Sequence, residues 1–272
     1  MRKLFLLIFI VGCIASTNKT CACSILYYVD KNTGKIYVAN NEDYWYETKT
    51  YIQINPRSEN KYARLWYGWD DFAQGGINEA GLFFDGAVTP IQKGPSFYTN
   101  PAGNMGDHIL ATCKTVDEAI NYINERNIAL PNAHIMFGDS TGNAKIIEWV
   151  NGKQQIISIK DNRLVMTNFH LSDTTTGNFP CYRYSAINEN LNKLEINSDT
   201  LDLLKIGNAL GQSAQTPKQN ENGKIGGTLY STFINITDME FFLVYKLDNT
   251  KVTKLDLKAE FDKQKKQKIK LK

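Results

Sequence analysis

The sequence predicts an α+β protein in which layered sheets are covered by helices. Three observations support this: β-rich segments lie at the start, middle and end of the chain, helical patterns come in two batches, and no repeat or linker divides the chain. The 272 residues are 42% hydrophobic and 22% charged, a globular composition that excludes disordered, collagen-like and coiled-coil chains. One domain of this length lies within single-core sizes.

The first expected element is a hairpin. Two β-rich segments, 24–29 and 35–39, flank a run of turn-forming residues. Pairing that continues back from this turn places Cys23 opposite about residue 42, beside the polar cluster 40–43. The hairpin therefore surrounds Cys23 with amide and carboxyl side chains.

The later elements follow from turn chemistry, caps and hydrophobic period. Strands are expected over 82–84, 134–137, 145–150, 154–159, 164–167, 229–236 and 240–247, and helices over 116–123, 181–192 and 198–211. Thr115 with Glu118 makes a capping box for the first of these helices, and Ser198 is the expected cap of the last. Residues 212–227 lack a core pattern and predict a mobile loop.

Residues 1–22 have the pattern of a removable signal peptide. Arg2 and Lys3 precede an apolar run, Leu4 to Gly12, that is too short to span a bilayer. The segment holds three of the 31 bases and none of the 28 acids, so its removal leaves 28 bases against 28 acids. The formal charge of +3 thus gives no reason to expect a nucleic-acid partner. We expect an exported protein with no integral membrane segment after signal removal.

Five cysteines, an odd number, leave room for a reactive thiol in an exported protein. Cleavage after Ala22 would make Cys23 the first residue, and its α-amino group, with an ordinary pKa of about 7.7–8.0, could serve as its base. Other interpretations stay open. The mature chain could begin at Cys21, a lipobox-like motif could make Cys13 a lipid-bearing terminus, or the boundary cysteines could be incidental or paired with later ones.

A set of motifs in family order carries a resemblance: Cys23-Ser24, Asn40 to Trp45, Gly76 to Leu82, Asp139 to Asn143 before Ile147-Glu148, Met166 to Phe169, and Arg183-Tyr184. Together they resemble the choloylglycine hydrolase and penicillin V acylase family, with its acyl-CoA:6-aminopenicillanic acid acyltransferase-like relatives. These proteins are N-terminal nucleophile (Ntn) amidases. The resemblance implies a four-layer αββα sandwich, with 23–272 as one domain that ends in a basic tail at about 251–272.

The resemblance also implies roles for individual residues. Cys23 matches the nucleophile that attacks an amide carbonyl to give a thioester. Asp43 matches the aspartate that holds the amine or thiol of that cysteine. Asn168 matches the asparagine that stabilises the oxyanion, and Arg183 matches an arginine that fixes the charge geometry of the site.

Two departures from the family pattern bear on substrate binding. Ala39-Asn40 stands where the family usually has an arginine, which weakens the expectation of bile-salt specificity. Val88 falls where the family has a second oxyanion-hole asparagine, and a backbone N–H could replace that donor. We expect Asn40 and Val88, with Trp45 and His170, to line the substrate pocket.

The expected function is hydrolysis of a linear, non-peptide amide bond in a small N-acylated substrate. Transfer of the acyl group to an amine is the competing enzymatic interpretation, and a catalytically silent, ligand-binding lipoprotein of the same fold is the non-enzymatic one. No cofactor is expected, and no metal, because the histidines and cysteines lack ligand spacing. His134 and His170 are not expected to be the base, since the α-amine makes one unnecessary.

The tail, 251–272, carries nine lysines and three acids. Such a run predicts a solvated, frayed end, or a segment with weak attraction to an anionic surface. The sequence gives no prediction of oligomeric state.

Overall fold

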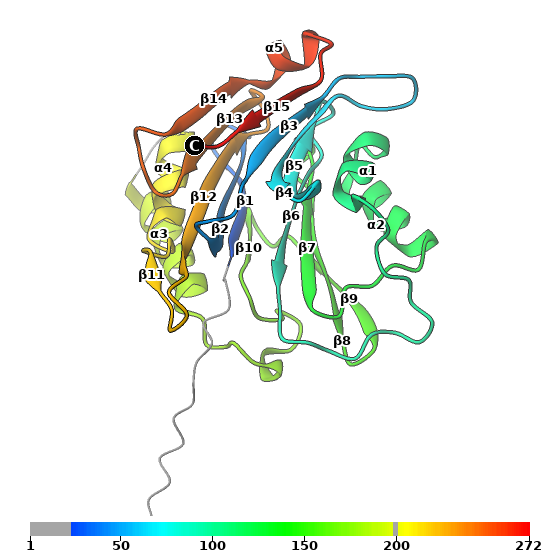
Figure 1. Cartoon of the computed structure of the whole chain (residues 1–272). Helices are drawn as coiled ribbons and strands as arrows, with labels where there is room; N and C mark the ends of the chain where they lie inside the picture. The colour runs from blue at the N-terminus through cyan, green and yellow to red at the C-terminus, as the bar shows by residue number, and fades with distance from the viewer. Residues whose placement is uncertain (1–22, 198–200) are drawn as a thin grey trace, which may run out of the picture.

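A computed structural model describes residues 23–197 and 201–272 (Figure 1). The expected signal peptide, with Cys13 and Cys21, and the expected cap Ser198 lie outside the described residues. Two antiparallel sheets pack face to face, with helices α3 and α4 on one outer side and α1 and α2 on the other. The predicted four-layer αββα sandwich is therefore confirmed.

The first sheet has the order β10-β1-β2-β12-β13-β14, with β11 paired to β12. Its strands are β1 (Ser24–Val29), β2 (Ile36–Trp45), β10 (Arg163–Met166), β11 (Lys218–Gln219), β12 (Ile225–Asn235), β13 (Glu240–Tyr245) and β14 (Val252–Asp256). Two helices, α3 (Tyr182–Asn197) and α4 (Leu203–Gly211), cover its outer face. The second of these begins later than predicted, because Asp202 rather than Ser198 caps it.

The second sheet has the order β15-β3-β4-β5-β6-β7-β8-β9. Its strands are β3 (Tyr51–Asn55), β4 (Arg64–Trp69), β5 (Phe72–Asn78), β6 (Phe83–Val88), β7 (Ala133–Gly138), β8 (Ala144–Val150), β9 (Lys153–Ser158) and β15 (Gln267–Lys270). The helices α1 (Met105–Thr112) and α2 (Val116–Glu125) cover its outer face. A short 3-10 turn, η1 (Thr174–Thr176), and α5 (Leu257–Asp262) complete the elements.

Strand alternation fixes which side chains meet between the sheets. On β1, Ile25 and Tyr27 belong to the core between the sheets, whereas Leu26 and Tyr28 pack under α3 and α4. Cys23 belongs to the core between the sheets as well. The first residue of the proposed mature chain thus points into the interior.

The first hairpin has the predicted register. Asp30 N–H donates to the Lys35 carbonyl at 2.8 Å, and Ser24 pairs with Asn41 across β1 and β2. One further step along this antiparallel ladder places Cys23 opposite Glu42.

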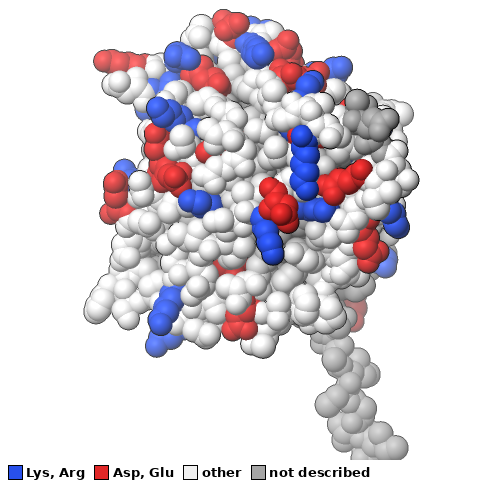
Figure 2. All heavy atoms as spheres, turned by 180° about the vertical axis from the view of Figure 1, so that it is seen from behind, with Lys and Arg blue, Asp and Glu red and all other residues white. Residues whose placement is uncertain are grey.

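The basic tail is ordered secondary structure rather than a frayed end. It forms β14, α5 and β15, and β15 pairs with β3 at the edge of the second sheet. Ile269 and Leu271 alternate with the lysines and pack against the core between the sheets, which anchors the segment. On the face shown in Figure 2, basic and acidic side chains are interspersed rather than gathered by sign.

The expected loop 212–227 contains β11 and the start of β12, which form a small hairpin. The sequence did not predict this pairing, because both residues of β11 are polar and solvent-exposed and give no hydrophobic pattern. None of the described helices combines the length and apolar character required to cross a membrane.

Candidate active site

Arg183, near the start of α3, joins three parts of the site. Its Nη1 donates to the Cys23 carbonyl at 2.5 Å and to Ser24 Oγ at 3.0 Å, and its Nη2 donates to Asn168 Oδ1 at 2.9 Å. The side chain is buried, with 6% of the residue exposed. A planar guanidinium with donors on several edges can hold such a set in one geometry.

The contact with Arg183 also orients the amide of Asn168. Because a guanidinium only donates, the Asn168 atom that faces it is the oxygen, and the amide nitrogen points the other way. Asn168 Nδ2 donates to the Val88 carbonyl at 2.8 Å, at the end of β6 in the second sheet. A primary amide has two N–H groups, and the Val88 contact needs only one, so the other is available to a substrate oxygen.

The thiol of Cys23 contacts Glu42, a residue that the sequence interpretation missed. Cys23 Sγ donates to Glu42 Oε1 at 3.3 Å, whereas Asp43 Oδ1 accepts a hydrogen bond from Thr228 Oγ1 at 2.5 Å. The cause is strand alternation, since Glu42 lies opposite Cys23 on β2 and Asp43 points to the other face. The register of the hairpin was the signal that could have distinguished these two adjacent acids.

Burial controls the titration of these groups. Burial raises the pKa of the Cys23 thiol, and the charges of Glu42 and Asp43 raise it further. Burial raises the pKa of Glu42 to about 8, against the hydrogen bond from Cys23. It raises the pKa of Asp43 to about 7, against the hydrogen bond from Thr228 and the charge of Arg183. A thiol in these surroundings is a poor thiolate former and requires a base.

A third buried acid, Asp85 on β6, lies on the facing sheet. Tyr67 Oη donates to its Oδ2 at 2.7 Å, and the Gly86 N–H donates to its Oδ1 at 2.8 Å. Burial raises the pKa of Asp85 well above its usual range, and the charge of Glu42 adds to this shift. The interior next to Cys23 therefore contains two carboxyl groups that favour the protonated form.

Several buried polar atoms around Cys23 have no hydrogen-bond partner in the described structure. They are Glu42 Oε2, both amide atoms of Asn40, and Tyr230 Oη, although the Asn40 side chain lies close enough to Glu42 to lower its pKa. Asn40 is two residues before Glu42 on β2 and shares its face, so it lies beside Cys23 as expected. Unpartnered polar atoms are costly in a protein interior, and a cluster of them indicates a place prepared for another group.

The other three residues expected in the pocket lie in different places. Val88 is 47% exposed and contacts Asn168 through its carbonyl, next to the site. Trp45 instead packs at the β11–β12 hairpin, where Gly226 lies against its ring, because it points to the face of β2 opposite Glu42. His170 is 1% exposed, and its Nδ1 lies 2.8 Å from Thr176 Oγ1 in the short turn η1 that follows Asn168 in the chain.

A surface hollow of about 580 Å³ lies elsewhere, near the end of β2 and along β15. Its lining includes Tyr46, Thr50, Asp71, Lys246 and Lys268, and none of the expected catalytic residues. Hydrogen bonding and buried acids, rather than the size of a cavity, identify the site around Cys23.

The sandwich architecture is that of the Ntn hydrolases, and solved structures of that class match it. A variant of conjugated bile acid hydrolase from Clostridium perfringens has 18% sequence identity and a TM-score of 0.72, covering 91% of this chain and 97% of that chain. Penicillin V acylase from Agrobacterium tumefaciens has 18% identity and a TM-score of 0.67, covering 87% and 86% respectively. The Caenorhabditis elegans ortholog of N-acylethanolamine-hydrolyzing acid amidase has 12% identity and a TM-score of 0.56, covering 90% and 99%.

At such identities, these likenesses show the fold. The sequence itself matches the family model for acyl-coenzyme A:6-aminopenicillanic acid acyl-transferase over residues 29–241. The chain therefore belongs to that family, and the predicted resemblance to the choloylglycine hydrolase and penicillin V acylase group is confirmed. A comparison with curated protein sequences gave no significant match.

Proposed function

We propose that the protein is an exported cysteine Ntn amidase that hydrolyses a linear, non-peptide amide bond of a small N-acylated substrate. One observation carries the proposal: Arg183 binds the Cys23 carbonyl and the Asn168 side chain at once. A nucleophile candidate and an oxyanion-donor candidate, 145 positions apart by residue number (168 − 23), are thus held on one rigid group. The amide hydrolases among the structural neighbours support the same reaction class.

In the proposed mechanism, cleavage before Cys23 frees its α-amino group, which accepts the thiol proton. Sγ attacks the substrate carbonyl, and the oxyanion receives a hydrogen bond from Asn168 Nδ2. The α-ammonium returns the proton to the leaving nitrogen as the C–N bond breaks, which leaves a thioester on Cys23. Water then attacks the thioester and releases the acid and the free thiol.

The buried acids fit this scheme. A new α-ammonium at Cys23 is a cation with three N–H donors, which is the kind of group that the unpartnered Glu42 Oε2 lacks. Asp43 is close enough for its charge to act on the Cys23 thiol, and its Oδ2 is also unpartnered among the described residues. We assign Glu42 as a positioning residue for both the thiol and the new α-amine, and Asp43 as a second positioning residue for the amine.

Acyl transfer is the second candidate, and the family model favours it by its name. In that case an amine rather than water takes the acyl group from Cys23. The two reactions share every step up to the thioester. Asn40 in place of the usual arginine argues for a substrate other than a bile salt, and Val88 leaves the rim beside Asn168 partly apolar.

A partition experiment tests the proposal. The protein is mixed with an N-acyl amide, and the acylated intermediate is trapped by acid and located by peptide mass analysis. We expect an acyl adduct on the peptide that contains Cys23. In a second measurement, an amine is added in graded amounts, and the ratio of acid to new amide among the products compares hydrolysis with acyl transfer. An adduct at another residue, or ligand binding without turnover, would contradict the amidase assignment and favour the binding protein.

A further inference from the structure

A buried histidine and glutamate on the second sheet contact the segment that carries Asn168. His134 on β7 and Glu148 on β8 lie opposite each other, one step beyond the Ile135–Ile147 pair of the ladder. Both residues are fully buried, and His134 Nδ1 lies 3.2 Å from Glu148 Oε2. Neither residue has a part in the mechanism proposed above.

The pair contacts the backbone on both sides of Asn168. His134 Nε2 lies 2.6 Å from the carbonyl oxygen of Thr167, the residue immediately before Asn168. Glu148 accepts hydrogen bonds from the backbone N–H of Leu171 at 3.1 Å and of Ser172 at 2.6 Å. The polypeptide from 167 to 172 is thus held by contacts from strands of the facing sheet.

The geometry also sets which groups of the pair can donate. Both ring nitrogens of His134 face oxygen acceptors, the Glu148 carboxylate at Nδ1 and the Thr167 carbonyl at Nε2, and a histidine that donates to both carries two ring hydrogens. Burial opposes ionisation of Glu148, but the hydrogen bonds from His134 and Ser172 outweigh it and lower its pKa. The Glu148 carboxylate thus faces three donors, on His134, Leu171 and Ser172. Hydrogen bonds to an ionised acceptor are stronger than neutral ones, so they hold the position of this segment more firmly.

We propose that the His134–Glu148 pair is a positioning element for the oxyanion donor Asn168. It holds the backbone of Asn168 from the second sheet, while Arg183 holds the Asn168 side chain against Cys23 of the first sheet. The distance between nucleophile and oxyanion donor is then set by contacts from both sheets. This inference rests on the proposed function, since it assigns the pair to the same reaction.

The main test compares Glu148→Gln with Asn168→Ala and with the double variant. We expect Glu148→Gln to lower kcat about 10- to 100-fold, because a displacement near 1 Å costs about that much, with KM changed less than about twofold. Once Asn168 is absent, its position no longer matters. The double variant should therefore lose no more activity than Asn168→Ala alone.

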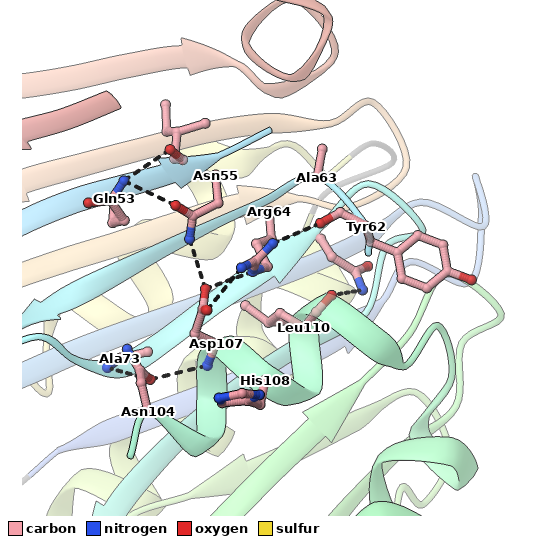
Figure 3. A network of polar contacts seen from close by, with 12 residues as sticks. Gln53, Asn55, Tyr62, Ala63, Arg64, Ala73, Asn104, Asp107, His108 and Leu110 are labelled. Atoms are coloured by element: carbon pink, nitrogen blue, oxygen red, sulfur yellow. Dashed lines mark hydrogen bonds and ion pairs between the residues drawn. The ribbon is translucent and has the colours of Figure 1, made fainter. Parts of the chain in front are cut away.

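A matched control is the Arg64–Asp107 ion pair, which lies between β4 and α1 (Figure 3). Asp107→Asn also breaks a hydrogen-bonded, largely buried pair, here between the second sheet and α1, and the hydrogen-bond partners of Arg64 and Asp107 include none of the residues that contact Asn168. It should lower the melting temperature while kcat stays unchanged. Hydrogen exchange of the Leu171 and Ser172 amides should accelerate in Glu148→Gln and not in Asp107→Asn.

Losses that add in the double variant, or an unchanged kcat in Glu148→Gln, would overturn the positioning role. If Glu148→Gln does not fold, nitrogen NMR of His134 in the wild-type protein gives a second test. Hydrogens on both ring nitrogens at neutral pH are expected. A neutral ring with one hydrogen would contradict the proposed contacts of His134 with Glu148 and Thr167. The hydrogen-exchange and NMR readouts need no turnover, so failure there is distinct from turnover that survives Cys23→Ser, which would defeat the proposed function itself.

Discussion

Two buried polar clusters in this molecule differ in how completely their atoms are paired. In the Arg64–Asp107 cluster, Arg64 donates to both Asp107 oxygens at 2.7 and 2.9 Å, and Asn55 donates to one of them at 2.9 Å (Figure 3). In the Cys23 cluster, Glu42 accepts a hydrogen bond from the thiol through one oxygen, and its second oxygen makes no hydrogen bond of good geometry in the described structure, although the Asn40 side chain lies close enough to lower its pKa. The first cluster is a balanced ion pair, whereas the second is a set of acids.

The contrast separates a structural network from a site. A buried pair with satisfied donors and acceptors contributes to one fixed geometry, and nothing is left for a ligand. Buried acids with open acceptor atoms cost stability, and they persist where another group is to be bound or a proton is to be moved. The comparison therefore predicts that changes in the Cys23 cluster alter activity and that changes in the Arg64–Asp107 cluster alter stability.

The largest expected effect is the loss of turnover in Cys23→Ser. We expect at least a ~10³-fold fall in kcat, because a serine hydroxyl is a much weaker nucleophile than the proposed thiol, with a melting temperature close to that of the wild type. Initial rates and thermal unfolding measure the two quantities. Cys181→Ser, which alters a more exposed thiol near Thr167, is the control and should retain its rate.

Removal of the oxyanion donor should have the next largest effect. Asn168→Ala should lower kcat about 10²- to 10³-fold, the usual loss for one such donor. Steady-state kinetics against Asn178→Ala, which deletes the side chain that donates to the Asn168 carbonyl, provide the comparison. Equal losses in both variants would indicate disruption of the segment rather than loss of an oxyanion contact.

The Arg64–Asp107 cluster should respond in the opposite way. Asp107→Asn leaves a largely buried guanidinium without its anion, and we expect the free energy of unfolding to fall by about 3 kcal/mol. Urea unfolding measures the change, and kcat measured well below the melting temperature should not move. A fall in kcat at full folding would break the distinction between the two clusters.

The smallest effect concerns pH and the acids around Cys23. The pKa of Glu42 is raised from 4.5 to about 8, so the folded chain holds a proton that the unfolded chain releases over that interval. Stability of the continuous chain should therefore fall as pH rises from about 5 to 8, by up to about 1.4 kcal/mol per pH unit for one proton. Glu42→Gln should make this slope shallower in urea titrations.

A chain that starts at Cys23 offers the sharper form of the same test. Its α-ammonium would favour the Glu42 carboxylate and reduce the slope, relative to a chain that starts at an acetylated Ala22. Identical slopes in the two chains would contradict the assignment of Glu42 to the neighbourhood of the new terminus.

Local rules predicted the parts of the fold that local contacts determine. The turn after β1 fixed the hairpin register, and this register placed Cys23 opposite residue 42 as the structure has it. The same alternation, applied one residue further, would have separated Glu42 from Asp43. The family motif pointed to Asp43, although alternate residues of a strand face opposite sides of the sheet and only Glu42 faces the Cys23 thiol.

The contacts between sheets could not be predicted from the sequence. Asn168 contacts the Val88 carbonyl, 80 positions away in the chain, and Arg183 lies buried where an arginine on a helix is usually solvated. Strands β3 to β5 were not predicted: glycines interrupt the pattern of β4 and β5, whereas β3 is short but β-rich and lay within reach of local rules. Contacts between the sheets arise from packing between layers. Turn-forming residues and the hydrophobic periodicity of single elements do not predict such packing.

The most direct test of the central claim is the intact mass of the protein after expression of the full chain in a host that secretes proteins. The account predicts a chain that begins at Cys23, with a free α-amino group beside the Glu42 carboxyl. A mature chain that keeps Ala22, or that carries a lipid on Cys13 with the peptide bond before Cys23 uncut, would contradict it.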